Sequence, residues 1–105
     1  MSTQARLPFE SRVEREFADW IATADGVLVA TEIVARARRL LARGVRHYGV
    51  KAMFESIRYD WTIGLLGGAE YRLNNNHTSL MARHLMDRHP ELRGFFETRE
   101  LRGRL

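Results

Sequence analysis

Residues 71–90 read YRLNNNHTSLMARHLMDRHP, a stretch in which three consecutive asparagines run directly into a predicted helix. Asparagine is a poor helix former but is favoured at caps and turns, so the triplet marks a break in regular structure. The unpaired N–H groups and the positive dipole end of a helix N-terminus favour anions such as phosphate. The triplet therefore predicts either a nucleic-acid contact or, in a purely structural interpretation, a turn whose last member caps the helix.

The helix after the asparagines is predicted to run from about Thr78 to Arg88, because His89-Pro90 ends it. Its apolar stripe consists of Leu80, Met81, His84 and Leu85. Ser79 and Arg83 fall on the other side, so we expect a half-exposed helix with a polar outer face.

Apolar residues also recur at helical spacing in three earlier segments. We expect a first helix over about 9–24, ended by Asp25-Gly26, and a second that is capped by Thr31 and stopped by Gly44. A third helix is predicted from Val50 to about Gly64.

Short strands are predicted between and after these helices. Residues 45–48 indicate a short strand or an extended link, and residues 69–73 alternate as a half-buried strand does. Residues 95–101 fit a strand or a helix, and we favour the strand.

The pattern predicts a mainly α fold with a small β component, with about four helices and two or three short strands. A winged-helix or helix-turn-helix variant fits a basic chain of this length, with the fourth helix as recognition helix and a wing formed by 69–73 and 95–101. The connection from the third helix to the fourth is longer than a plain helix-turn-helix uses. A four-helix domain with a small sheet, unrelated to DNA reading, is the alternative.

A single domain is expected over residues 1–105, because the chain is long enough for one core without staples. Within it we expect a disordered start over 1–7, a helical part over 9–43 and a winged-helix-like part over 44–101. The chain is 45% apolar and 29% charged and has no cysteine, which excludes disulfides, thiolate zinc sites and cysteine nucleophiles. No apolar run is long enough to span a bilayer and no signal peptide is evident, so we expect a cytoplasmic protein.

Positive charge is concentrated in the last two-thirds of the chain. Residues 1–30 carry three arginines against five acidic residues, a balance of −2, whereas residues 31–105 carry fourteen basic against eight acidic residues, a balance of +6. Arginine and lysine gain affinity for polyanions by releasing counterions, so this bias indicates a nucleic-acid partner. The spacing of Arg36, Arg39 and Arg43 places them on one side of the second helix, facing solvent or phosphate.

Two segments carry a resemblance to a known family: YGVKAMFESIRYDW over 48–61 and YRLNNNHTSLMARHLMDRHPELRGFFETREL over 71–101. Over residues 44–101 the chain resembles a family of small bacterial and phage or prophage proteins. Its pattern is a GxKxxFExxR segment, an LNNN turn before an S-x-x-A-R helix, and a P-x-L-x-G-x-F-E-x-R ending. The mobile-element context implies DNA handling, regulation or interference with host machinery.

The resemblance also draws attention to individual residues. Glu55 and Arg58 are expected to have structural roles, either by pairing with each other or by pairing with Arg99 and Glu97. His77 stands where the resemblance leads us to expect an aromatic residue, which predicts a wetter turn.

Catalysis and metal binding are not indicated. The four histidines lack acidic partners at matching spacing, the carboxylates are scattered, and no Gly-rich phosphate loop is present. We therefore expect a non-enzymatic protein without a cofactor or a metal. It would be a monomer or homodimer with no membrane contact.

Two classes of function remain: a DNA-binding module, and a phage-encoded protein-interaction module that inhibits a host nucleoprotein complex. In the first, Asn75, Asn76, Ser79 and Arg83 would face a groove while basic side chains hold the phosphate backbone. The residues predicted to bind are Arg36, Arg39, Lys51, Arg72, Asn74, Asn75, Asn76, Ser79 and Arg83.

Overall fold

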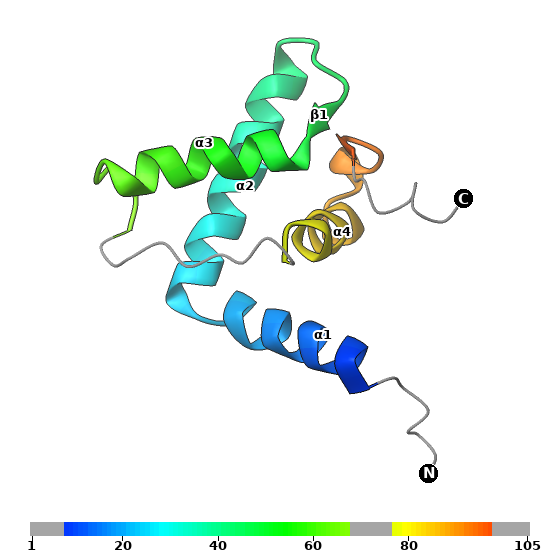
Figure 1. Cartoon of the computed structure of the whole chain (residues 1–105). Coiled ribbons are helices and arrows are strands. Elements are labelled where there is room, and N and C mark those ends of the chain that lie inside the picture. The colour runs from blue at the N-terminus through cyan, green and yellow to red at the C-terminus, as the bar shows by residue number, and fades with distance from the viewer. Residues whose placement is uncertain (1–7, 68–76, 98–105) are drawn as a thin grey trace.

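The structure is a computed structural model that describes residues 8–67 and 77–97. The elements in order are α1 (Pro8–Ile21), α2 (Ala24–Ala42), β1 (Tyr48–Gly49), α3 (Val50–Thr62), α4 (Thr78–Arg88), η3 (Pro90–Leu92) and β2 (Phe96–Glu97) (Figure 1). The expected mainly α fold with a small β component is confirmed. The helices predicted at 50–64 and 78–88 are confirmed as α3 and α4.

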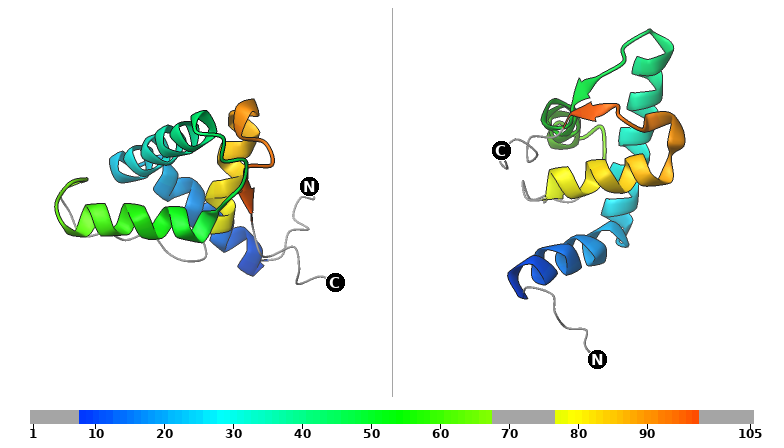
Figure 2. Two further views of the ribbon diagram at one scale, coloured as in Figure 1. Left: turned by 90° about the horizontal axis from the view of Figure 1, so that it is seen from above. Right: turned by 90° about the vertical axis from the view of Figure 1, so that its right-hand side faces the viewer.

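The helices enclose a single apolar core, with α2 in contact with α1, α3 and α4 (Figure 2). Ile33 and Ala37 of α2, Ile57 of α3 and Met81 of α4 are completely buried, and so is Leu92 of η3. These positions recur at the helical spacing that places them on one face. None of the described helices has the length and apolarity that crossing a membrane requires.

The small sheet pairs strands that lie far apart in the chain. β1 and β2 are parallel, with Tyr48 opposite Phe96 and Gly49 opposite Glu97, and the Tyr48 N–H donates to the Phe95 carbonyl at 3.0 Å. A strand after Phe95 is therefore confirmed for Phe96–Glu97. The partner of β2 is β1 and not the strand predicted over 69–73. Residues 69–73 lie outside the described residues, and so does the predicted disordered start over 1–7.

The junction of α1 and α2 corrects the prediction that Asp25-Gly26 ends the first helix and that Thr31 caps the second. α1 already ends at Ile21, and Thr23 is the N-cap of α2, with its hydroxyl accepting from the Gly26 N–H at 3.0 Å. Gly26 lies in the first turn of α2, where a Cβ atom would come 2.1 Å from the Trp20 carbonyl oxygen. The glycine is needed for this close approach, and it does not break the helix.

Two helix ends were correctly predicted from glycine. α2 ends before Gly44 and α3 before Gly64, both with positive φ. At the first, the Gly44 N–H donates to Leu41 and the Val45 N–H to Leu40, each at 3.0 Å. This Schellman arrangement satisfies the last carbonyls of α2 and turns the chain sharply toward β1.

Candidate nucleic-acid interface

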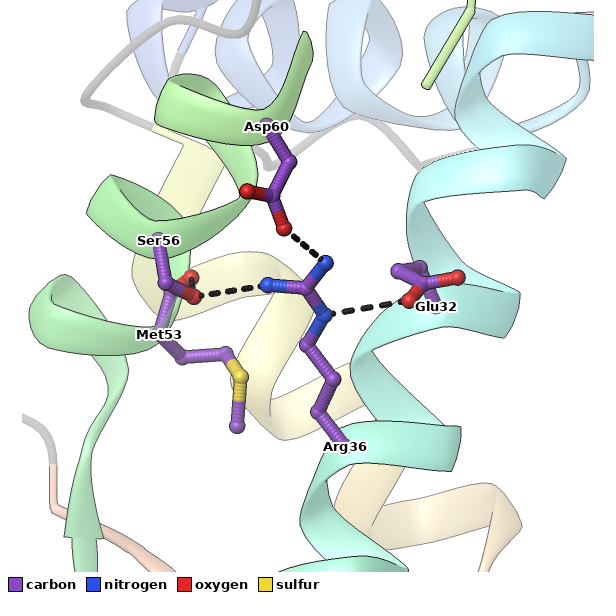
Figure 3. Close-up of polar contacts among 5 residues, drawn as sticks. All are labelled: Glu32, Arg36, Met53, Ser56 and Asp60. Carbon is purple, nitrogen blue, oxygen red and sulfur yellow. Dashed lines mark hydrogen bonds and ion pairs between the residues drawn. The ribbon is translucent and has the colours of Figure 1, made fainter. Parts of the chain in front are cut away.

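Arg36 joins α2 to α3 instead of facing solvent (Figure 3). Its Nε donates to Glu32 at 3.1 Å and its Nη1 to the Ser56 hydroxyl at 3.1 Å, while its Nη2 pairs with Asp60. The Ser56 hydroxyl in turn donates to the Met53 carbonyl at 2.8 Å. The side chain of Arg36 is only 18% exposed. Its guanidinium therefore has a structural role, and we leave it out of the interface.

The electrostatics of Arg36 agree with this role. Burial alone would lower the pKa of Arg36, but its hydrogen bonds to Asp60 and Glu32 outweigh the burial and raise that pKa. A partly buried cation with two carboxylate partners stays charged, and removing it would leave both carboxylates without their counter-ion.

Four other arginines lie on segments that come together where α2 turns toward β1 and η3 leads into β2; Figure 1 shows the arrangement of these segments. This basic end consists of Arg39, Arg43, Arg46 and Arg93, all of them exposed. No side chain of the four forms a hydrogen bond or an ion pair with another described residue. The guanidinium groups are therefore available to an external anion.

The backbone under the basic end is held from several sides. The Schellman turn at Gly44 fixes the exit from α2, and His47 Nδ1 lies 3.3 Å from the Gly94 carbonyl oxygen. Arg38 pairs with Glu91 through two hydrogen bonds of 2.8 and 2.6 Å, which ties α2 to η3. Because these contacts link the segments that carry the four arginines, the charges are presented on a defined framework.

Among the described residues, η3 and β2 carry two carboxylates, Glu91 and Glu97. Glu91 is already paired with Arg38, and Glu97 is exposed at the end of β2, beside Gly49. Lys51 is exposed on the first turn of α3, directly after β1. The predicted role of Lys51 in binding stays a prediction.

α4 is half-exposed, as predicted. Met81, Ala82 and Leu85 are buried, whereas Arg83 is exposed and Ser79 is partly exposed. At 100° per residue, Ser79 and Arg83 point away from the buried side of the helix. Ala82 is an addition to the predicted stripe. The outer face of α4 is thus polar, although Arg83 and Ser79 also make interactions within the chain.

The asparagine triplet over 74–76 and Arg72 lie outside the described residues, and so does Arg99. Their predicted binding roles stay predictions. The alternative that Asn76 caps the helix is wrong, because the N-cap of α4 is His77, whose side chain makes no cap hydrogen bond. The pair predicted between Glu55 and Arg58 is present as an exposed contact of 3.9 Å, a distance at which an ion pair contributes little.

His77, just before α4, corrects the expectation of a wetter turn. It is only 7% exposed, and the centroid of its ring lies 5.7 Å from the ring centroid of Phe17 and 6.2 Å from that of Trp20. His84 also packs edge-on against Phe17, at 5.7 Å. The histidine thus takes the packing position of an aromatic residue.

Burial lowers the pKa of His77, with Glu16 partly opposing the shift, and burial together with Arg88 lowers the pKa of His84. Both rings are therefore neutral near pH 7. Neither nitrogen of His77 has a hydrogen-bond partner in the structure as described. The described part of the chain contains no group of three or more histidine, cysteine or acidic side chains that could hold a metal.

Two arginines of the basic end, Arg46 and Arg93, were not predicted as binding residues. One signal could have indicated the first. Residues 33–54 contain six basic side chains and no acidic one, a bias that the charge balance of larger segments conceals. Arg93 lies far away in the sequence, and its segment is brought to the others by the parallel pairing of β1 and β2 and by the Arg38–Glu91 contact.

Comparison of the chain with protein-family models, with curated proteins and with solved structures found no match.

Proposed function

We propose that this protein binds nucleic acid, with duplex DNA as its target, through the basic end. The observation that carries the proposal is that Arg39, Arg43, Arg46 and Arg93 are exposed, form no ion pairs with other described residues, and lie on segments that meet at one end of the fold. Unpaired arginines are the side chains best suited to phosphate, because they donate several hydrogen bonds in a fixed plane and stay charged.

Affinity in this proposal comes mainly from phosphate contacts. Such contacts are independent of sequence and strongly dependent on salt, because binding releases counterions from the duplex. The outer face of α4, with Ser79 and Arg83, supplies the candidate base contacts together with the asparagines over 74–76. The role that fits is a cytoplasmic accessory or regulatory protein of phage or prophage type, which acts without catalysis and without a cofactor.

The experiment is a fluorescence anisotropy titration of a labelled random-sequence duplex, repeated across a salt series. We expect a Kd of about 1–100 μM at physiological salt for the unmodified protein, as is usual for binding without sequence preference. The paired substitution Arg43→Glu and Arg46→Glu should weaken binding by at least about tenfold at low salt, because two phosphate contacts become repulsive.

The matched control is Arg12→Glu with Arg15→Glu. Both residues are exposed on α1, and the pair changes the net charge by the same amount. It should weaken binding much less than the basic-end pair. Equal losses for the two pairs would mean that net charge alone, and no particular surface, determines binding.

A second candidate function, the protein-interaction module, is favoured by an apolar surface at the end of α3. Tyr59, Ile63 and Leu65 are 64%, 52% and 69% exposed. Exposed apolar side chains close together indicate a protein contact. Absence of any duplex binding at about 50 mM salt, where phosphate contacts are strong, would leave this candidate in place of the first.

A further inference from the structure

A groove lies along α2, on a different side of the helix from the contacts of Arg36. One of its walls is apolar and the other is lined by arginines. It lies where the end of α1 meets α2 and α4, and its volume is about 480 Å³. This volume falls in the range of sites for drug-sized molecules. We call it the α2–α4 groove.

The apolar wall comes mainly from α2. Val27, Ala30 and Val34 follow one another along the helix at spacings of three and four, and Ile21 at the end of α1 and Leu85 of α4 complete this wall. Val27 is 53% exposed, so the lip of the groove presents apolar surface to solvent.

The other wall carries two arginines. Arg88 of α4 and Arg38 of α2 line it beside the neutral ring of His84, and no carboxylate is among the described lining residues. Arg38 already pairs with Glu91, whereas no carboxylate of the described residues lies within ion-pair distance of Arg88. Arg88 is therefore the cation with capacity for an anionic group.

From this combination we propose that the α2–α4 groove binds a small amphipathic anion, whose apolar body lies along Val27, Ala30 and Val34 and whose carboxylate or sulfonate pairs with Arg88. Charge complementarity selects the head group, because an anion beside a cationic wall gains an ion pair. Burial of Val27 and Ile21 against the ligand selects the apolar body. The site is separate from the basic end, so the two proposals can fail independently.

The test uses two fluorescent probes that differ by one sulfonate group: 8-anilinonaphthalene-1-sulfonate and its neutral parent N-phenyl-1-naphthylamine. We expect saturable one-to-one binding of the sulfonate, tighter than binding of the neutral probe by about tenfold or more, the factor that corresponds to one charge-assisted hydrogen bond. Dodecanoate should displace the sulfonate competitively.

Two substitutions locate the site. Val27→Asp places a carboxylate on the lip of the groove, and Arg88→Glu reverses the charge that contacts the head group. Each substitution should lower the affinity for the sulfonate probe by at least about tenfold. Ile63→Asp, just after α3, and Arg12→Glu, on α1, are matched controls at exposed positions, where we expect less than about a twofold change.

Three results with the two probes and the variants would overturn the proposal. The first is equal affinity of the protein for the two probes. The second is an Arg88→Glu variant that binds the sulfonate probe as tightly as the unmodified protein does. The third is an Ile63→Asp variant that loses binding of the sulfonate probe while the Val27→Asp variant retains it. Urea melts of all four variants establish that each is folded, which is expected because the substituted side chains are exposed. Displacement of the probe by an acidic peptide but not by dodecanoate would likewise reject a small-molecule ligand.

Discussion

The α2–α3 junction and the basic end use arginines of the same helix in opposite ways. Arg36 is largely buried and bonded to Glu32, Ser56 and Asp60, whereas Arg39, less than one turn further along, is exposed and has no ion pair with a described residue. The difference comes from the neighbouring helix, because α3 offers a carboxylate to one position and not to the other. An arginine stripe on a helix is therefore not one functional unit.

Removing Arg36 tests the structural half of this comparison. Arg36→Ala leaves Asp60 and Glu32 without their shared cation, and we expect a loss of about 1–3 kcal/mol in the free energy of unfolding, less than for a fully buried pair. The measurement is urea denaturation followed by circular dichroism.

Arg39→Ala is the control for that measurement, since it removes the same side chain from the same helix. Its expected cost is less than about 0.5 kcal/mol, the usual range for surface substitutions. Similar losses for both variants would contradict the separation of the two regions.

Gly44 connects the two regions, because it ends α2 and turns the chain into the basic end. A Cβ atom at Gly44 would meet nothing within 4 Å, but φ is +93°. Gly44→Ala should therefore cost about 1 kcal/mol through backbone strain alone. Differential scanning calorimetry of this variant beside Gly49→Ala, also without neighbours but at a negative φ of −70°, measures that cost. Identical melting temperatures for the two variants would argue against the strain.

His77 extends the comparison to a buried ionisable group that lacks the partners that Arg36 has. Because its folded-state pKa lies below the ordinary value of 6.5, the unfolded state binds more protons between these two values. Stability should therefore fall as the pH drops below about 6.5, the unfolded pKa. His84, shifted in the same direction, contributes to the same fall.

We expect His77→Phe to keep the packing against Phe17 and Trp20 and to remove part of this acid sensitivity. The change in stability should be smaller than the changes expected for Arg36→Ala and Gly44→Ala. Urea midpoints at pH 7 and pH 5 provide the measurement. An unchanged pH dependence in the variant would assign the sensitivity to other groups.

Much of the fold could be predicted from periodicity and glycine. The bounds of α4 and the ends of α2 and α3 followed from apolar spacing and from Gly44 and Gly64, because these signals are local. The predicted start of α2 was wrong because Gly26 was interpreted as a helix breaker. Its actual role, the close approach to Trp20, depends on how two helices pack, and no local pattern records that.

The candidate site was predictable only in part, for a related reason. Spacing placed Arg36, Arg39 and Arg43 on one side of a helix, but it could not show that Asp60 and Ser56 would come to Arg36 from another helix. Arg93 likewise reaches the basic end through a strand pairing between distant segments. Contacts that depend on tertiary packing decide which charges remain available.

The most direct test of the central claim, that Arg39 serves binding while Arg36 serves the fold, is the salt dependence of duplex binding by the two single alanine variants. The logarithm of the association constant is plotted against that of the salt concentration, with each value corrected for the folded fraction. We predict that Arg39→Ala flattens the slope by about 0.9, one phosphate contact, and that Arg36→Ala leaves it unchanged. Flattening by Arg36→Ala with none by Arg39→Ala would contradict the account.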